Sequence, residues 1–197
     1  MIKAIVFDLS GVIFTRMSNI HEILEPIIGL KKDEITLKMK NKSFYDFLEG
    51  KINEDDYWKK IIGGNSWNIS IDELKKAMRD NFREIEGTLN IIKKLKKNGF
   101  LLGLLSSHTK EWTQYLNQKY DYEKYFDGIV YSFNEGDTKT NISLYKEILF
   151  KLKVSSYECI YIDDKEKYIE PAKILGMKTI LFEDSEKLKN RLNYFLR

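Results

Sequence analysis

Short apolar runs recur along the chain and predict buried β-strands. They cover residues 3–7, 100–105, 128–131, 159–162 and 178–182. A stretch with helical periodicity, residues 89–95, leads into the second run. Others lie between and after the later runs, at residues 109–119, 142–152, 165–175 and 184–195. Strands that alternate with helices are typical of an α/β fold, in which helices cover both faces of a parallel sheet.

The gap between the first two apolar runs differs, because it shows helical signals only. From Ile20 onward, apolar residues recur at helical spacing, and no strand pattern returns before residue 100. We therefore expect an α/β core made of residues 1–15 and 82–197. A helical segment, residues 16–81, is predicted to be inserted after the first strand.

Local signals mark helix ends within this insertion. Asn53 is placed to cap the helix that follows it, and Ser70 forms a capping-box pattern with Glu73. Gly63 and Gly64 stand between these two helices. Because glycine disfavours helix interiors, the pair is predicted to break the chain there.

Composition agrees with a globular protein and excludes several classes. Of 197 residues, 43% are hydrophobic and 32% charged, which argues against disorder. The net charge of +3 gives no strong attraction to nucleic acid or to a membrane surface. The single cysteine, Cys159, lies in an apolar run and is expected in the core. With no signal pattern and no membrane-length apolar run, we expect a cytoplasmic protein, monomeric or a small homo-oligomer.

Side chains capable of chemistry stand at the strand ends. The first strand ends at Asp8, and Ser10 and Gly11 follow. Carboxyl ends of parallel strands lie where such sheets place their ligands, and Gly11 allows a tight turn against one. Taken alone, Asp8 could equally be a turn residue.

The second and third strands end in hydroxyls and a lysine. Ser106 and Ser107 can donate hydrogen bonds to an anion, although Ser107 could simply cap the next helix. His108 is predicted to be a partly exposed loop residue. Lys139 follows the third strand and means little by itself.

Two adjacent acids, Asp163 and Asp164, end the fourth strand. Neighbouring carboxylates repel each other unless a cation lies between them, and carboxylate with phosphate oxygens suits Mg²⁺. All of these strand ends meet at one edge of one sheet. Together with Asp8 and Lys139, the pair can bind a phosphoryl group and a metal, and the set supplies an attacking carboxylate.

This order of motifs resembles the haloacid dehalogenase superfamily, in particular its branch with a helical cap after the first strand. The similar segments are FDLSGV at residues 7–12, LLSS at 104–107, Lys139 with Tyr145 six residues later, and the pair Asp163-Asp164. The resemblance covers nearly the whole chain. It implies a Rossmann-like core with a parallel five-stranded sheet flanked by helices, and an inserted helical cap.

The resemblance also implies an activity. The chain would be a hydrolase, a Mg²⁺-dependent phosphatase acting on a small phosphorylated metabolite. Asp8 would attack phosphorus and form an aspartyl phosphate. Ser106, with Ser107 beside it, would hydrogen-bond the transferred phosphoryl group, and Lys139 would neutralise its charge. Mg²⁺ would be held by residues of two motifs: Asp8, the backbone carbonyl of Ser10, Asp164, and Asp163 close by.

Ser10 departs from the family pattern. Phosphatases of this family usually carry a second Asp at this position, which protonates the leaving oxygen. A serine hydroxyl cannot act as an acid near neutral pH, and losing a general acid typically costs about 10²–10⁴ in rate. We therefore expect a preference for leaving groups that need no proton, such as aryl or acyl phosphates.

Two other functions stay open. Ser10, Ser107 and Tyr168 would suit a catalytically weak or inactive relative that binds a ligand or a protein, whereas the intact charged residues oppose it. Dehalogenation or phosphonate cleavage on the same fold is the other alternative. Dehalogenation by family relatives needs no metal, so the acid pair argues against it.

The sequence of the insertion does not identify the substrate. Phosphonate cleavage would need a cap lysine for a Schiff base, and the available lysines are Lys38, Lys40, Lys42 and Lys51. Nothing in the sequence singles one out. Tyr45, Trp58 and Trp67 could line a pocket, although aromatic residues at helical spacing more often pack in a core.

Overall fold

The computed structural model describes residues 1–196, and its centre is one sheet of five parallel strands in the order β3-β2-β1-β4-β5. The strands are β1 (Ala4–Phe7), β2 (Leu101–Ser106), β3 (Gly128–Tyr131), β4 (Cys159–Asp163) and β5 (Lys178–Leu181). The expected α/β fold, with a Rossmann-like parallel five-stranded sheet flanked by helices, is confirmed. Each strand lies within one residue of its predicted bounds at either end.

The middle of the sheet is fully buried. In β1, Ala4 pairs with Leu101 on one side and with Cys159 on the other, and all four β1 residues are buried. All residues of β4 are also buried, which confirms the core position of Cys159. Strands covered on both faces require continuous apolar runs, and this is why the runs were visible in the sequence.

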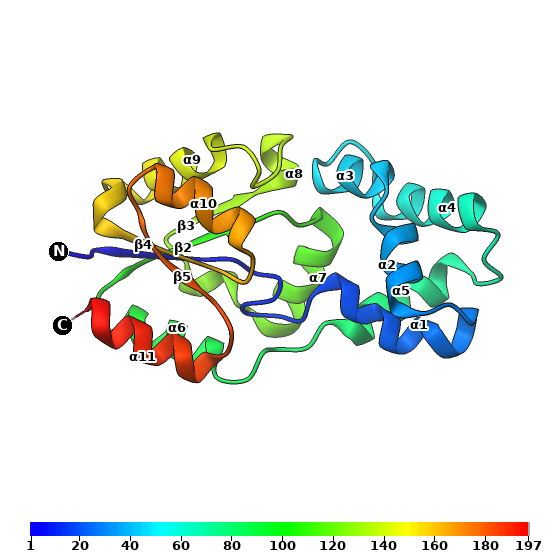
Figure 1. The fold of residues 1–197 in the computed structure, drawn as a ribbon, viewed down its shortest axis with the longest axis horizontal. Coiled ribbons are helices and arrows are strands. Elements are labelled where there is room, and N and C mark those ends of the chain that lie inside the picture. Colours follow the sequence, from blue (N-terminus) through cyan, green and yellow to red (C-terminus); the bar gives the residue numbers. More distant parts are fainter. Residues whose placement is uncertain (197) are drawn as a thin grey trace.

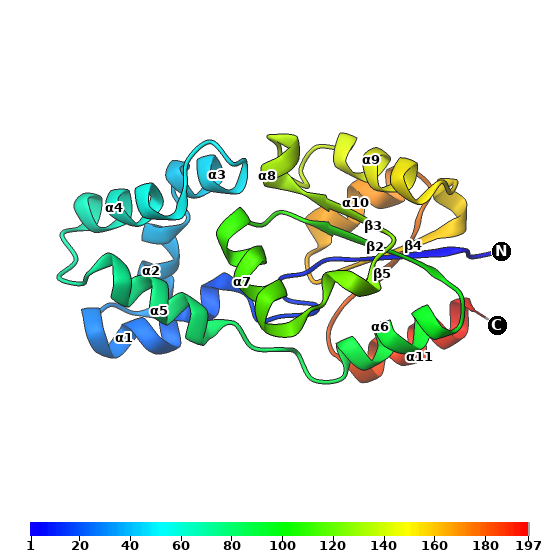
Figure 2. The ribbon, with the colours of Figure 1, turned by 180° about the vertical axis from the view of Figure 1, so that it is seen from behind.

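Helices cover both faces of this sheet (Figures 1 and 2). They are α6 (Thr88–Lys97), α7 (Lys110–Tyr120), α8 (Ser132–Glu135), α9 (Ser143–Leu152), α10 (Glu166–Ile174) and α11 (Ser185–Phe195). In Figure 1, α9 and α10 lie above the sheet, and α6 and α11 lie below it. Short 3₁₀ turns occur at η1 (Met17–Ile20), η2 (Glu123–Tyr125) and η3 (Ser156–Glu158).

The chain between β1 and α6 forms a group of helices at the end of the molecule opposite the two termini (Figure 1). They are α1 (His21–Ile28), α2 (Lys32–Met39), α3 (Lys42–Leu48), α4 (Glu54–Asn65) and α5 (Ile71–Asn81). This group stands beyond the carboxyl ends of the strands. It therefore faces the edge at which the candidate chemical groups gather.

The predicted caps are present, but the predicted glycine break is wrong. Asn53 accepts a hydrogen bond from the Asp56 amide, and Ser70 forms the capping box with Glu73. Helix α4, however, continues through Gly63 and Gly64. Two glycines cost a helix about 1 kcal/mol each. Burial of other α4 side chains outweighs that local preference, since Tyr57, Trp58 and Ile61 are fully buried.

A single cluster of buried side chains joins one face of the sheet to the helical group. Trp58 and Trp67 are part of it, whereas Tyr45 is 49% exposed. Trp112 on α7 packs against Phe47 and Trp58 of the helical group, with ring centroids 5.1 and 6.2 Å apart. Among residues 1–196, no helix has the length and apolar character needed to cross a bilayer.

Candidate active site

Three strand ends place their polar side chains side by side. Asp8 directly follows β1, Ser106 ends β2 and Asp163 ends β4. Because β1 pairs with both β2 and β4, these ends are neighbours in space. The Ser106 hydroxyl donates a hydrogen bond of 3.0 Å to Asp8 Oδ1. The structure thus brings together the residues that the strand-end pattern had selected.

Lys139 lies buried between two of these acids. Its Nζ is 2.8 Å from Asp8 Oδ1 and 2.6 Å from Asp163 Oδ2. The Ser107 hydroxyl accepts a hydrogen bond of 2.9 Å from the Lys139 amide, so this serine fixes the backbone of the lysine. Burial opposes the positive charge, but Asp163 and then Asp8 outweigh burial and raise the pKa of Lys139. The ammonium is therefore permanent at neutral pH.

The two oxygens of Asp8 differ in their surroundings. Oδ1 accepts hydrogen bonds from the Leu9 amide at 2.7 Å and from the Ser106 hydroxyl, in addition to the contact with Lys139. Within residues 1–196, no hydrogen bond uses Oδ2. Because three donors hold one oxygen, the carboxylate is oriented while its second oxygen stays available for chemistry.

Opposing influences act on the pKa of Asp8. Burial raises its pKa to about 6; Lys139 acts against this, while Asp163 and Asp164 add to it. Asp8 is therefore mostly ionised at pH 7 even without a bound cation. A further positive charge at the site would favour the ionised form.

The acids form a set that fits a divalent cation. Oxygens of Asp8, Asp163 and Asp164 lie within 4.8 Å of one another. Asp164 Oδ1 is buried and has no hydrogen-bond partner, while the other oxygen of Asp164 pairs with Arg16. A buried carboxylate oxygen without a donor is costly unless a cation satisfies it. The donor set is all oxygen, which suits Mg²⁺.

Gly11 shapes the backbone around this acidic cluster. Its φ is +92°, a region that favours glycine, and a Cβ there would collide with the Asp164 carboxylate. A side chain at this position would push Asp164 away from Asp8 and Asp163. The turn after β1 therefore needs glycine for close approach, as the sequence indicated.

His108 corrects a prediction, since it is buried rather than partly exposed. Its ring packs 5.9 Å from those of Phe82 and Trp112, and Nδ1 accepts a hydrogen bond of 3.0 Å from the Thr109 amide. Burial lowers the pKa of His108 to about 4. The imidazole is thus neutral at pH 7, with its hydrogen on Nε2. Long-range packing caused the difference, and the sequence around His108 carried no sign of it.

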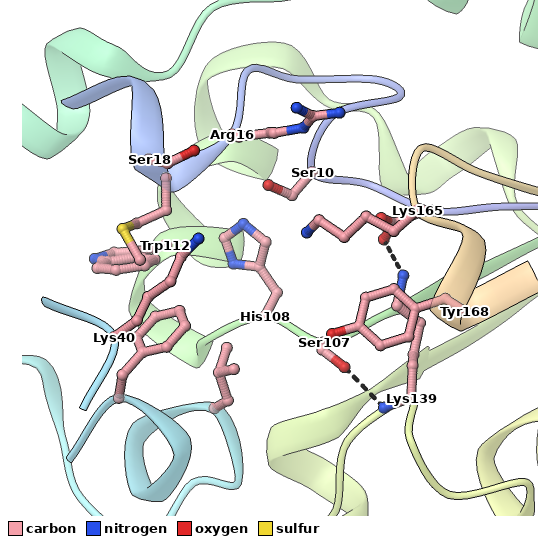
Figure 3. A pocket seen from close by; sticks show the side chains of 14 residues that line it. Ser10, Arg16, Ser18, Lys40, Ser107, His108, Trp112, Lys139, Lys165 and Tyr168 are labelled. Atoms are coloured by element: carbon pink, nitrogen blue, oxygen red, sulfur yellow. Dashed lines mark hydrogen bonds and ion pairs between the residues drawn. The ribbon is translucent and has the colours of Figure 1, made fainter. Parts of the chain in front are cut away.

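These residues open into a pocket of about 180 Å³ between the sheet edge and the helical group (Figure 3). Asp8, Ser10, Ser107 and Lys139 line it. The pocket also includes residues that the sequence did not reveal: Arg16, Lys40, Trp112, Lys165 and Tyr168. Arg16 and Lys165 follow the first and fourth motifs closely, which is a weak signal. Lys40 and Trp112 had no signal at all.

Of the four lysines considered in the insertion, Lys40 alone lines this pocket. Lys38 donates a hydrogen bond to Asn65. Lys42 pairs with Asp46 and Lys51 pairs with Glu49 on the surface of the helical group. The fold therefore singles out one lysine where the sequence could not.

Comparison with known proteins agrees with this geometry. The family model for haloacid dehalogenase-like hydrolases matches residues 5–182. A sesquiterpene phosphatase of Aspergillus oryzae is 26% identical over 191 residues, covering 93% of this chain and 91% of the relative. A D-ribitol-5-phosphate phosphatase of Bacteroides thetaiotaomicron is 24% identical, covering 100% and 99% of the two chains.

Solved structures show the same fold at low sequence identity. A predicted haloacid dehalogenase-like hydrolase from Porphyromonas gingivalis superposes with a TM-score of 0.80 at 20% identity, covering 100% of this chain and 98% of its own. A family enzyme from Bacteroides thetaiotaomicron, crystallised with magnesium and inorganic phosphate, gives a TM-score of 0.77 at 20% identity, covering 93% and 96%. The family match spans most of the chain, the topology agrees, and the expected hydrolase class is confirmed. The chain belongs to the haloacid dehalogenase-like hydrolase family.

Proposed function

We propose that the chain is a Mg²⁺-dependent phosphatase that hydrolyses a small phosphorylated metabolite through an aspartyl phosphate. The observation that carries this proposal is the arrangement around Asp8. One of its oxygens is held by three donors, its other oxygen is available, and two further carboxylates lie beside it. Buried acids kept this close together need a cation, and a cation is also what lets a carboxylate approach a phosphate.

In the first step, Asp8 Oδ2 attacks phosphorus and the bond from phosphorus to the leaving oxygen breaks. The leaving oxygen takes the bonding electron pair. In this proposal Lys139 and Ser106, which both contact Asp8, stabilise charge on the transferred phosphoryl group. Mg²⁺, held by Asp8, the Ser10 carbonyl and Asp164 with Asp163 close by, would offset the negative charges that meet there.

In the second step, water attacks phosphorus of the aspartyl phosphate. The bond to Asp8 breaks, inorganic phosphate leaves, and the water proton passes to solvent. Ser10 supplies no acid for the leaving oxygen in the first step. Leaving groups that depart as stable anions, such as aryl or acyl oxygens, are therefore favoured.

The helical segment, residues 16–81, acts in this proposal as a cap over the core formed by residues 1–15 and 82–197. Its Lys40, Phe44 and Leu48 line the same pocket as Asp8. A cap in this place excludes water and selects the leaving group. The phosphatase names of the two relatives support the same reaction class.

The test is hydrolysis of p-nitrophenyl phosphate with and without Mg²⁺, comparing the native chain with Asp8→Asn. We expect activity that requires the metal and disappears in the variant. Asp121→Asn, which changes an exposed acid that pairs with Lys124 outside the pocket, controls for the loss of a charge. Activity that survives in Asp8→Asn, or that does not depend on the metal, would contradict the proposed mechanism.

The same experiment separates the alternatives. A chain that binds Mg²⁺ yet is inactive toward every phosphate ester tested would be a ligand-binding relative on a phosphatase fold. Halide release from a haloacid without metal, or phosphate release from a phosphonate, would indicate the other chemistries of this fold. The clustered acids make the metal-dependent reaction the one to test first.

A further inference from the structure

The pocket wall carries more positive charge than its acids neutralise. The charged residues that line it are Asp8, Arg16, Lys40, Lys139 and Lys165. Lys139 and Arg16 are already paired with carboxylates. Within residues 1–196, no ion pair involves Lys40 or Lys165. Two ammonium groups in one pocket are therefore left without a counter-charge.

These two lysines come from opposite walls. Lys40 immediately follows α2 in the helical group, and Lys165 immediately precedes α10 at the sheet edge. In Figure 3 both ammonium ends point toward the middle of the pocket, with the His108 ring between them. A ligand lying between the helical group and the core can thus meet both.

The pKa of Lys40 reflects the positive charges around it. Partial burial lowers its pKa, and the positive charges of Lys165, Lys167 and Arg16 lower it further; Asp164 acts weakly in the other direction. Like charges gathered around one pocket repel each other when it is empty. An anion placed among them relieves that repulsion.

The rest of the pocket wall includes apolar side chains. Met17, Phe44, Leu48 and Trp112 line it. Under the proposed function, Lys139 and the Mg²⁺ held by the clustered acids would bind the phosphoryl group. The pocket therefore combines a phosphoryl site, apolar walls and a second cationic site.

We propose that the substrate is a phosphomonoester whose leaving group carries a second anion, a carboxylate or another phosphate, bound by Lys40 and Lys165. This inference rests on the proposed phosphatase function and narrows its substrate class. It assigns to Lys40 a role in selecting the leaving group. The helical segment would then recognise the charge of the leaving group as well as its shape.

The test measures binding without turnover, in the full-length Asp8→Asn chain with Mg²⁺ present. Three probes share one scaffold: phenyl phosphate, 4-carboxyphenyl phosphate and hydroquinone bisphosphate. We expect one or both of the probes with a second anionic group to bind about tenfold or more tightly than phenyl phosphate, as is usual for charge-assisted hydrogen bonds. The probe with the larger gain identifies the second anion as carboxylate or phosphate.

Lys40→Met and Lys165→Met, each added to Asp8→Asn, should remove most of that gain. Lys42→Met is the matched control, because it deletes a lysine two residues away that is paired with Asp46 on the surface. Equal affinity for all three probes would overturn the proposal. So would an equal loss for all three probes in Lys40→Met, since this would indicate general attraction of anions.

Failure of this proposal can be told from failure of the phosphatase function. A native chain that hydrolyses phenyl phosphate with Mg²⁺, while its Asp8→Asn form shows no preference among the probes, overturns only the second anion site. A native chain that hydrolyses none of the probes, while the preference persists and depends on both lysines, overturns only the phosphatase function.

Discussion

The indole of Trp112 donates a hydrogen bond of 2.6 Å to Glu54, and this contact joins α7 of the core to α4 of the helical group. Glu54 is only 3% exposed. Arg79 pairs with both of its oxygens at 2.5 Å, and the Trp58 indole donates a further hydrogen bond of 3.2 Å. A single buried carboxylate therefore holds three donors from two parts of the chain.

Replacing this carboxylate should destabilise the fold strongly. In Glu54→Ala, Arg79 loses its partner and two buried indole groups lose their acceptor. Breaking a buried pair in this way costs about 3–5 kcal/mol. Asp55→Ala is the control: it removes an exposed ion pair with Lys75, and such pairs contribute about 1 kcal/mol or less. Urea unfolding followed by tryptophan fluorescence checks this, and equal midpoints for the two variants would contradict it.

Ser10→Asp should supply an acid next to Asp8, the proposed nucleophile. We expect turnover of an alkyl ester such as glycerol 2-phosphate to rise roughly tenfold or more, since general acids contribute about 10²–10⁴ in rate. Turnover of p-nitrophenyl phosphate should rise less, because its leaving group needs no proton. Ser10→Ala, which adds no acid, should give no gain on either ester. Equal gains on both esters would mean that the new carboxylate acts in some way other than protonation.

The sheet and its reactive edge could be predicted from sequence because both depend on local patterns. Continuous apolar runs mark buried parallel strands, and the topology then brings Asp8, Ser106 and Asp163 to one edge without further information. Lys139 was placed by its position after the third strand. Chemistry carried on strand ends is thus visible before any coordinates exist.

The rest depends on contacts between distant parts of the chain. His108 is buried because Phe82 and Trp112 pack around it. Phe82 belongs to a distant part of the chain, and nothing in the sequence around His108 indicates that contact. Lys40 reaches the pocket only through the orientation of the helical group. The bounds of that group as a separate unit, residues 16–81, stay a prediction. Packing also overrode the local preference of Gly63 for a helix break.

Burial of His108 predicts a loss of stability in acid. Its pKa is about 4 in the folded chain and about 6.5 when unfolded, so between these values the unfolded state binds more protons. Stability should therefore fall as pH drops from about 6.5 to 4, by up to about 3 kcal/mol from this group. Asp8 acts in the opposite direction, since its folded pKa is raised.

His108→Gln isolates this contribution, because the opposite effect of Asp8 is present in both proteins and cancels in the difference. The difference in unfolding free energy between the native chain and His108→Gln should change by up to about 3 kcal/mol between pH 7 and pH 4. His21→Gln removes the other histidine and should leave the acid-dependent drop in place. Parallel pH profiles for the native chain and His108→Gln would mean that the pKa of His108 is the same in the folded and unfolded states, which would contradict the prediction.

The raised pKa of Asp8 predicts how metal binding depends on pH. In the metal-free chain its pKa is raised to about 6, first by burial, and a metal ligand must be deprotonated. Mg²⁺ affinity should therefore be nearly constant above pH 7 and fall by about tenfold per pH unit well below 6. Titration calorimetry checks this, because each Mg²⁺ bound below pH 6 should release about one proton to the buffer. Asp8→Asn should bind more weakly but lose this pH dependence, whereas an unchanged slope in that variant would assign the proton to another group.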